Sequence, residues 1–480
     1  MLIIIEPAQI KCRFCCLEIE GSENMHINLP EKVDYILKKL QKQGFEAYAV
    51  GGCVRDALLG REPEDWDITT SAKPEQVKEI FRRTIDTGIQ HGTVTVMMEK
   101  EGFEITTYRI DGNYEDGRHP TEVQFTSDLI EDLKRRDFTI NAMAYNQDEG
   151  LVDAFDGAGD LTNGIIRCVG NPIERFSEDA LRMLRAVRFA GQLDFEIEEE
   201  TKQAIVKLCS NLEKISAERI RVELDKLLCS KRPEHLLTAS KLGITGIVLP
   251  EFDRMLATGQ NHPHHQYNVG IHTLKAIEHV HEQGEELKFD KKTLSLLSWT
   301  ALLHDIGKPL TKTVDEEGID HFYYHVPKSR NMAKDILKRL RWDNHTIDTV
   351  CRLVQYHDVN FSKKKGKMRR LMNEIGVEYM PDLFIIMKAD ILSQSMYMRE
   401  EKLQNLQEAK KLFEEIRAAG DPVDLKMLEV NGVDLQEAGF HKGKLLGVIL
   451  NGLLERVMEE PELNQKETLL ALAKENWGKE

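Results

Sequence analysis

Apolar residues near the N-terminus repeat first at helical and then at strand spacing. Residues 29–44 carry one helical stripe, formed by Val33, Ile36, Leu37 and Leu40. Residues 47–50 are a short apolar run, which predicts a buried strand. Gly51 and Gly52 interrupt this run, and residues 54–59 then predict a short helix. The pattern therefore predicts a helix, a strand, a glycine turn and a second helix.

The glycine turn between the strand and the helix is suited to binding phosphate. Glycine lets backbone N–H groups approach a phosphate closely, which makes Gly52 a candidate nucleotide-binding residue. Arg55 adds a positive charge in the first turn of the helix. The spacing fits neither GxxxxGK[ST] nor GxGxxG, so we expect neither a P-loop nor a dinucleotide fold.

Two aspartates follow in the segment Asp65-Trp66-Asp67-Ile68. If this is a strand, the two aspartates face one side while Trp66 and Ile68 face the other. The aspartates suit a pair of Mg²⁺ ions, because Mg²⁺ prefers oxygen ligands and shares them with substrate phosphates. A simple Asp-x-Asp turn is the alternative interpretation of these residues alone. The preceding glycine turn favours the metal site, and together the two features predict transfer of a nucleotide from a triphosphate.

Residues 93–98 and 103–110 have strand patterns joined by a turn. Glu104 lies on the second of these strands. It is either a third catalytic carboxylate, which helps to deprotonate an RNA 3′-hydroxyl, or a plain solvent-facing side chain.

A basic segment follows at residues 134–145, which read KRRDFTINAMAY. We expect a helix capped by Asp137 or Thr139. Arg135 and Arg136 would then stand just before its start, where phosphates bind well. A basic surface turn is the alternative. Residues 151–169, beyond this segment, are expected to form a hairpin.

From residue 171 the pattern is helical almost to the end. One helix is predicted to open at residues 176–179, with Ser177 as its N-cap. Arg182, Arg185 and Arg188 follow at three-residue steps and wind along one flank of this helix. A solvated, salt-bridged face is one interpretation of such a run. The acidic pair beside it favours a clamp for a triphosphate and base.

The segment GGCVRDALLGREPEDWDITT, residues 51–70, resembles the signature of the class II CCA-adding tRNA nucleotidyltransferases and bacterial poly(A) polymerases. Later motifs agree in the family's order, from about Met25 to the C-terminus. The resemblance implies an α/β (α+β) polymerase-β-like nucleotidyltransferase head, followed by an all-α neck, body and tail. It implies Mg²⁺ at Asp65 and Asp67, with ATP, CTP and tRNA as partners.

The resemblance also implies roles for later motifs. The motif with Arg136 and Asp137 is expected to contact the nucleotide sugar and phosphates. The family's EDxxR motif, here Glu178 to Arg182, replaces a nucleic-acid template. Ionised Asp179 accepts and Arg182 donates hydrogen bonds, a pair that suits cytosine and adenine and rejects uracil and guanine. The polar, glycine-rich residues 111–121 resemble a mobile family loop needed to add the terminal A, which argues against CC addition only.

Histidines crowd residues 259–305, and Leu302 to Lys308, LLHDIGK, resembles the HD phosphohydrolase signature. The superfamily's metal pattern is fitted in order by four residues: His272, His304, Asp305 and Asp390. Further candidates, as in two-metal members, are His325, His357 and Asp358. Imidazole and carboxylate ligands suit Mn, Fe, Ni or Zn better than Mg. An HD-type helical scaffold that has lost its metal is the alternative.

Length and charge restrict the expected number of domains, the location and the partners of the protein. The 480 residues should form several domains, and no apolar run approaches the 18 residues of a membrane span. We expect a cytoplasmic protein whose eight scattered cysteines stay reduced. The net charge of −16 argues mildly against nucleic-acid binding, but local basic clusters decide phosphate affinity. The strongest cluster, residues 363–370, is either an RNA contact or a solvated loop.

We therefore expect five segments. They are an extension at 1–24, a head at 25–150, a neck at 151–235 that binds base and triphosphate, an HD-containing body at 236–400 and a tRNA-binding tail at 401–480. The extension contains a CxxCC cluster, but a zinc site needs about four ligands and no second ligand pair lies near it. The expected reaction adds C and A to the tRNA 3′ end and releases pyrophosphate. A poly(A) polymerase or A-adding enzyme is one alternative. A metal phosphohydrolase whose head only binds RNA is another.

Overall fold

The computed structural model describes residues 26–112 and 123–478. The expected extension at 1–24 and nearly all of the glycine-rich loop at 111–121 lie outside these residues. The chain forms two compact units, one of residues 1–186 with 195–211 and one of residues 187–194 with 212–480. Among the described residues, no helix is both long and apolar enough to cross a membrane. The five described cysteines are free thiols.

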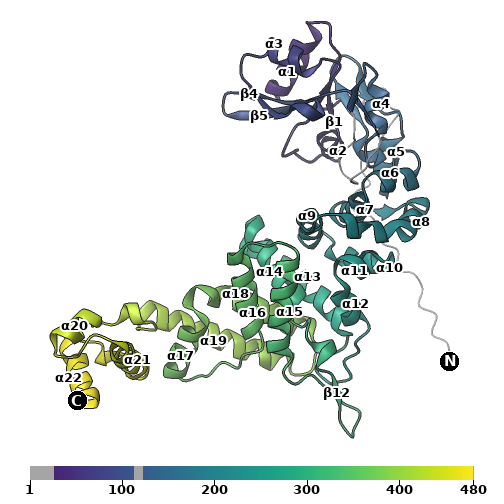
Figure 1. Ribbon diagram of the computed structural model, residues 1–480. Coiled ribbons are helices and arrows are strands. Elements are labelled where there is room, and N and C mark those ends of the chain that lie inside the picture. Colours follow the sequence, from purple (N-terminus) through teal and green to yellow (C-terminus); the bar gives the residue numbers. More distant parts are fainter. Residues whose placement is uncertain (1–25, 113–122, 479–480) are drawn as a thin grey trace. The chain divides into compact units, whose positions relative to one another are not determined.

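The first unit is built on a seven-stranded sheet with the strand order β3-β4-β5-β2-β1-β8-β9 (Figure 1). Its strands are β1 Ala47–Val50, β2 Ile68–Thr70, β3 Thr84–Gly88, β4 Thr93–Met98, β5 Glu101–Thr107, β8 Ala144–Asn146 and β9 Gly150–Val152. Two small ladders pair β6 Arg109–Asp111 with β7 Val123–Phe125, and β10 Ile165–Ile166 with β11 Glu196–Ile197. The helices are α1 Glu31–Gln41, α2 Gly52–Leu58, α3 Pro74–Ile80, α4 Leu129–Lys134, α5 Gly157–Asn163, α6 Pro172–Glu178 and α8 Glu199–Leu208, while α7 Leu181–Leu193 continues into the second unit.

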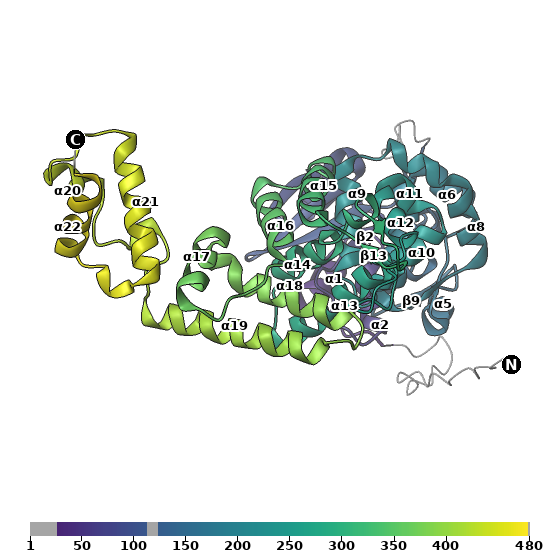
Figure 2. The same cartoon turned by 90° about the horizontal axis from the view of Figure 1, so that it is seen from below.

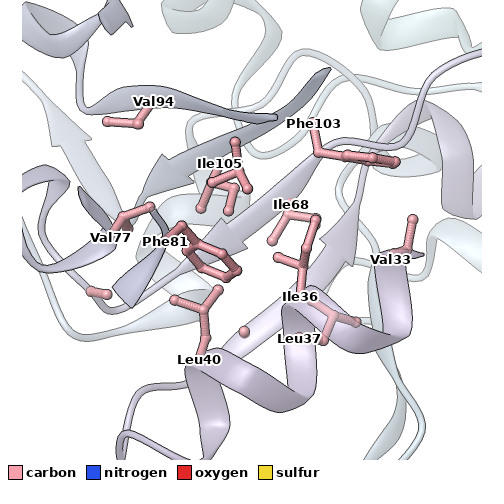
Figure 3. Packing of buried hydrophobic residues seen from close by; sticks show 13 residues of the cluster. Val33, Ile36, Leu37, Leu40, Ile68, Val77, Phe81, Val94, Phe103 and Ile105 are labelled. Carbon is pink, nitrogen blue, oxygen red and sulfur yellow. The ribbon is translucent and has the colours of Figure 1, made fainter. Parts of the chain in front are cut away.

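One core of this unit lies where α1 and α3 pack on the sheet. The stripe predicted for α1 is buried, and Figure 3 shows it pointing toward side chains of the strands and of the α3 region. The buried members of this core are Val33, Ile36, Leu37, Leu40, Ala47, Ile68, Ala72, Val77, Phe81, Val94, Val96, Phe103 and Ile105. Each large aliphatic side chain buried here contributes about 1.5–3 kcal/mol. This core therefore anchors β2 and β5, the strands next to the candidate metal ligands.

Three local predictions are wrong. The helix expected after Arg136 is only the 3₁₀ turn η2 Thr139–Asn141, because the chain then pairs as β8 with the buried strand β1. Residues 151–169 contain the helix α5 rather than a hairpin. Ser177 is no N-cap, since α6 starts earlier at Pro172 and is capped by Asn171.

The second unit is helical apart from one small hairpin. Its helices are α9 Ala217–Leu228, α10 Leu236–Lys241, α11 Ile244–Val248, α12 Pro250–Leu256, α13 Val269–Leu287, α14 Lys291–Leu303, α15 His325–Arg339, α16 Asn344–Tyr356, α17 Lys365–Ile375, α18 Met380–Ser393, α19 Arg399–Ala419, α20 Gly432–Glu437, α21 Lys444–Glu459 and α22 Lys466–Trp477. The hairpin pairs β12 Thr313–Val314 with β13 Asp320–His321.

The helices of this unit pack in pairs. α13 packs on α14 and α18, and α15 packs on α16. The long helix α19 packs on α18 and on α17 (Figure 2). α21 and α22 bury a separate apolar cluster near the C-terminus. An α/β head followed by all-helical segments confirms the fold class expected from the sequence.

Candidate active site and metal centre

The candidate metal carboxylates of the head meet where β2 begins and midway along its neighbour β5. β2 and β5 are parallel, with Ile68 opposite Ile105, so the preceding residues Asp67 and Glu104 also lie opposite each other. Trp66 packs on the core with Ile68, which leaves Asp65 and Asp67 exposed on the other side. β2 itself begins only at Ile68, so the predicted strand is shorter than expected, although the predicted alternation holds.

Electrostatic interactions connect these three carboxylates. Loss of water around Asp67 raises the pKa of its carboxyl despite the exposure of the side chain, Arg136 opposes this shift, and Asp65 adds to it. Burial raises the pKa of Glu104 as well, followed by repulsion from Asp67 and Asp65. Three crowded carboxylates with exposed oxygens form a donor set that fits divalent cations.

Arg136 approaches this group from the glycine turn. Gly51 has φ 85°, and a Cβ added to it would stand 2.7 Å from Arg136 Nη1. A residue without a side chain is therefore needed here for two reasons, the left-handed backbone and the contact with the guanidinium. Burial lowers the pKa of Arg136, and Asp132, Asp67 and Asp137 oppose that shift. Arg136 thus lies against the residue before α2, whose first helical residue is Gly52, and interacts electrostatically with Asp67.

Asp132 is a buried hub that the sequence analysis missed. Its side chain is fully buried and accepts hydrogen bonds from Thr69 Oγ1 at 3.1 Å, the Arg109 backbone N–H at 3.3 Å and Arg135 Nε at 2.9 Å. Arg136 Nη2 lies 3.8 Å from Asp132 Oδ2, the oxygen that accepts the bond from Thr69. Asp132 thus connects β2, which follows Asp67, with Arg135 and Arg136. Only its place four residues before Arg136 signalled this role, since helix neighbours lie at that spacing.

A second buried chain of polar contacts joins other predicted nucleotide-binding residues. Arg55 Nη1 donates to Asn141 Oδ1 at 2.6 Å, and Asn141 Nδ2 donates to Asp137 Oδ1 at 3.1 Å. Arg185 Nε donates to Asp137 Oδ2 at 2.8 Å. Burial alone would raise the pKa of Asp137, but Arg185 and the bond from Asn141 hold it far below its usual range. Arg55, Asp137 and Arg185 therefore interact with protein groups in this structure.

The predicted base-reading residues lie where α6 ends and α7 begins. Asp179 Oδ1 accepts the Leu181 backbone N–H at 3.0 Å. Arg182 donates to Glu178 at 2.5 Å and to the carbonyls of Arg175 and Arg135, both at 3.0 Å. Asp179 and Arg182 are thus three residues apart at this junction, and Glu178 fixes the guanidinium in place.

Arg188 belongs to the second unit and is separated from this group by its contacts there. Its Nε lies 2.6 Å from Glu223 Oε2 of α9, and its Nη1 donates to Gln192 at 2.7 Å. Both members of the ion pair are buried. The clamp predicted from three evenly spaced arginines is therefore divided among three different acidic partners: Glu178, Asp137 and Glu223.

The HD residues predicted from the sequence converge inside the second unit. His272 Nε2, on α13, lies 3.0 Å from Asp390 Oδ1 on α18 and 3.4 Å from Asp305 Oδ2. His304 Nε2, at the end of α14, lies 3.2 Å from the same Asp305 oxygen and 3.7 Å from Asp390. Ligands about 2.0–2.2 Å from one ion are separated by similar distances of about 3 Å.

A second group shares Asp305. Its other oxygen, Oδ1, lies 3.5 Å from His325 Nε2 and 3.7 Å from His357 Nε2. These two histidines come from the start of α15 and the end of α16. The remaining sequence candidate, Asp358, is exposed and lies outside both groups.

The bonding around these imidazoles fits metal ligation. The Nδ1 atoms of His304, His325 and His357 lie 2.7, 2.9 and 2.8 Å from backbone carbonyl oxygens. A carbonyl oxygen accepts a hydrogen bond from Nδ1–H, which keeps the ring proton on Nδ1 and leaves Nε2 with a lone pair toward the cluster. Asp305 is buried, its Oδ2 lies 2.7 Å from Lys308 Nζ, and its Oδ1 accepts no hydrogen bond. Burial would lower the pKa of His304, but Asp305 and Asp390 raise it, so the cluster attracts positive charge.

The basic segment 363–370 is largely paired with acid. Lys363 lies 2.7 Å from Glu408, and Arg370 lies 2.7 Å from Glu455. Arg369 is buried against Asp421 at 2.7 Å. The helix α17, rather than a loop, carries most of these residues. An RNA contact at this segment stays a prediction.

Three family descriptions match successive parts of the chain. They are "Poly A polymerase head domain" at residues 47–167, "Probable RNA and SrmB-binding site of polymerase A" at 194–256 and "HD domain" at 269–395. The first covers the carboxylates and Arg136, and the third covers all the HD ligands named above.

The chain is also similar to other proteins over nearly the whole length of both chains. It is 38% identical over 455 residues to the CCA-adding enzyme of Ligilactobacillus salivarius, covering 93% of this chain and 97% of that protein. Its fold is similar to a Bacillus stearothermophilus CCA-adding enzyme in complex with CTP, with a TM-score of 0.68, 28% identity and coverage of 92% and 95%. A Thermotoga maritima CCA-adding enzyme complexed with tRNA has the same fold, with a TM-score of 0.55, 20% identity and coverage of 93% and 95%.

We predict that Gly51→Ala weakens binding of a nucleoside triphosphate. The added Cβ would displace Arg136, and loss of a hydrogen bond from a charged donor corresponds to about a tenfold or larger loss of affinity. Gly44→Ala is the matched control, since Gly44 has φ 84° and nothing within 4 Å of an added Cβ. That control should lose about 1–2 kcal/mol of stability and no affinity. Equal affinities for the two variants in a titration with fluorescent triphosphate would contradict the assignment.

Proposed function

The chain belongs to the family of CCA-adding enzymes, nucleotidyltransferases of tRNA, and we propose that Asp65, Asp67 and Glu104 form the site that adds C and A to the tRNA 3′ end. The observation that supports this most is the group of three carboxylates at the start of β2 and the middle of β5, of which Asp67 interacts electrostatically with Arg136. Relatives aligned along almost their whole length carry the CCA-adding name, which favours this activity over poly(A) synthesis.

In the proposed reaction, the tRNA 3′-oxygen attacks the α-phosphorus of CTP or ATP. The bond from that phosphorus to the bridging oxygen breaks, and pyrophosphate leaves. Divalent ions, which we propose to be Mg²⁺, supply Lewis acidity when held by Asp65 and Asp67. Glu104 lies beside Asp67 with a raised pKa, so we assign it the proton from the 3′-hydroxyl.

The remaining residues bind or position the nucleotide. The N–H groups that follow Gly51 and the Arg136 guanidinium are proposed to bind the triphosphate. Asn141 joins Arg55 to Asp137, and Asp137 also accepts from Arg185, so we propose that this chain of hydrogen bonds holds the nucleotide-binding residues in place. We propose that the protein acts in the cytoplasm.

Base choice follows from hydrogen-bond chemistry. Cytosine and adenine each present an amino donor beside a ring-nitrogen acceptor, whereas uracil and guanine present a carbonyl beside an N–H. Asp179 accepts and Arg182 donates, and we propose that both reach the base from the junction of α6 and α7. A wrong base leaves buried polar groups unpaired at a cost of about 1–3 kcal/mol each.

We predict that Asp65→Ala and Asp67→Ala each lower nucleotide addition by about a thousandfold or more, because each removes a metal ligand. Binding of tRNA should persist, since phosphate contacts elsewhere supply it. Asp148→Ala, at an exposed aspartate of the β8–β9 turn, is the control. Near-normal incorporation of labelled CTP by either ligand variant would rule out the metal assignment.

We predict that Asp179→Ala and Arg182→Ala lose discrimination against UTP and GTP as well as rate. Arg175→Ala is the control, because Arg175 lies 2.5 Å from the same Glu178 but is not one of the proposed base readers. That variant should stay selective for CTP and ATP. Incorporation measured with each of the four nucleotides separates the outcomes. Slow but fully selective Asp179 and Arg182 variants would show that these residues do not read the base.

The HD centre supports a second function, a metal-dependent phosphohydrolase. The favouring observation is the pair of ligand groups that share Asp305, with Nδ1 of three imidazoles bonded to carbonyls. We propose that His272, His304, Asp305 and Asp390 hold one transition metal, which would activate water, and that His325 and His357 complete a second position.

We predict that His304→Ala and Asp305→Ala remove phosphatase or phosphodiesterase activity and leave nucleotide addition largely intact, since the two sites lie in different units. His345→Ala, at an exposed histidine of α16, should change neither activity. Metal analysis of the purified protein gives an independent measure. Less than a stoichiometric transition metal after metal-replete growth would favour the scaffold that has lost its ion.

A further inference from the structure

One face of the head's sheet carries polar side chains in register with the candidate metal ligands. Glu104 of β5 lies opposite Asp67 on the side of β2 and opposite Thr95 on the side of β4. Side chains that are directly opposite on paired strands share one face of a sheet. The next residues along these strands, Val94 and Ile105, lie in the core on the other face (Figure 3). The two carboxylates and Thr95 therefore form one row across neighbouring strands.

This row ends in a pair of threonine hydroxyls. Thr95 Oγ1 lies 2.8 Å from Thr87 Oγ1 of β3. The pairing of β3 with β4 is irregular between Ile85 and Gly88, and such irregularities re-aim side chains. The bond between the hydroxyls uses one of their two protons, so the pair can donate the other and can accept at its lone pairs. It therefore offers both a donor and an acceptor to a ligand.

The surface around the hydroxyl pair is accessible. Glu104 and Thr87 are exposed, and the side chain of Ile85 is 51% exposed. Gly102 precedes Glu104 on the same face of β5, and a Cβ added to Gly102 would stand 2.9 Å from Thr95 Cγ2. The absence of a side chain at residue 102 thus leaves room for a ligand beside Thr95.

The strand order indicates what this ligand is. The glycine turn that is proposed to bind the triphosphate follows β1, on one side of β2 and β5, whereas β4 and β3 lie on the other side. In transfer to phosphorus, the attacking and leaving oxygens lie roughly in line. If pyrophosphate leaves toward the glycine turn, the attacking 3′-hydroxyl of the acceptor lies on the side of β4. The terminal ribose of the acceptor then lies next to the hydroxyl pair.

We propose that the Thr87–Thr95 hydroxyl pair binds the 2′-hydroxyl of the acceptor's terminal ribose and thereby holds its 3′-hydroxyl beside Glu104. The proposal rests on the nucleotidyl transfer assigned to the three carboxylates. The 2′- and 3′-hydroxyls are on adjacent carbons, so a contact that holds one restricts the other. A 2′-hydroxyl is both a donor and an acceptor, as is the threonine pair, and it distinguishes RNA from DNA. The pair therefore selects RNA as the acceptor.

The test removes a hydroxyl from the protein and from the acceptor in turn. The first addition of CMP from CTP is measured on tRNA that lacks its CCA end and carries either ribose or 2′-deoxyribose at its last residue. The ratio of kcat/KM for the two acceptors should be about 2- to 12-fold larger for wild-type protein than for Thr95→Val, the range expected for one hydrogen bond. A purely structural effect would lower kcat/KM for both acceptors equally and leave the ratio unchanged.

Three comparisons control for other effects of the substitution. Thr95→Ser keeps the hydroxyl and should keep the wild-type ratio. Thr93→Val is the matched control, because Thr93 is about 6–7 Å farther along β4 and its hydroxyl pairs instead with Thr106 at 3.0 Å. It should also keep the wild-type ratio. The preference of Thr95→Val for CTP over dCTP should equal that of wild-type protein, since the incoming sugar is not the one bound by the pair.

The outcomes separate this proposal from the function on which it rests. Equal acceptor ratios for wild-type and Thr95→Val protein would overturn the proposal. A ratio lowered by Thr93→Val in place of Thr95→Val would also overturn it, as would a change in the preference for CTP in place of the acceptor ratio. Wild-type protein that adds no nucleotide to the ribose-ended tRNA would instead overturn the nucleotidyl transfer itself.

Discussion

The parallel pairing of β2 with β5 is the constraint on which the head depends. It sets Asp67 opposite Glu104, and it does so because Ile68 and Ile105 are buried side by side in the core beneath α1. A shift of one residue in this register would turn the carboxylates into the core and the isoleucines toward solvent. The apolar core and the candidate metal site are thus two faces of one pairing.

The crowding of carboxylates that this pairing creates is balanced by cations that the fold holds in place. Arg136 reaches the group only because residue 51 has no side chain. Asp132 in turn holds Arg135 and contacts Thr69, two residues beyond Asp67. Charge of both signs is therefore arranged before any nucleotide arrives, which is how preorganised sites lower the cost of stabilising a developing charge.

Periodicity predicted the elements whose burial is one-sided. The stripe of α1 and the alternation at Asp65 to Ile68 were predictable because one face of each meets the core, whereas β1 was predictable as a continuous apolar run that is buried throughout. The segment after Arg136 was not, since its local preference for a helix is overridden by the pairing of β8 with β1. The acidic partners of Arg185 and Arg188, which are Asp137 and Glu223, could not be predicted from the sequence either, because they lie 48 and 35 residues away. For the HD centre, the family pattern indicated the ligands, while the sharing of Asp305 required the packing of α15 and α16.

The head is proposed to add a defined C-C-A end without a template. The most direct measurement incubates the protein with tRNA that lacks its CCA end, supplies CTP, ATP or both, and sequences the 3′ ends. We expect CTP alone to add two residues and CTP with ATP to add three, ending in A. A long run of A from ATP, on this tRNA or on an unrelated RNA, would contradict it.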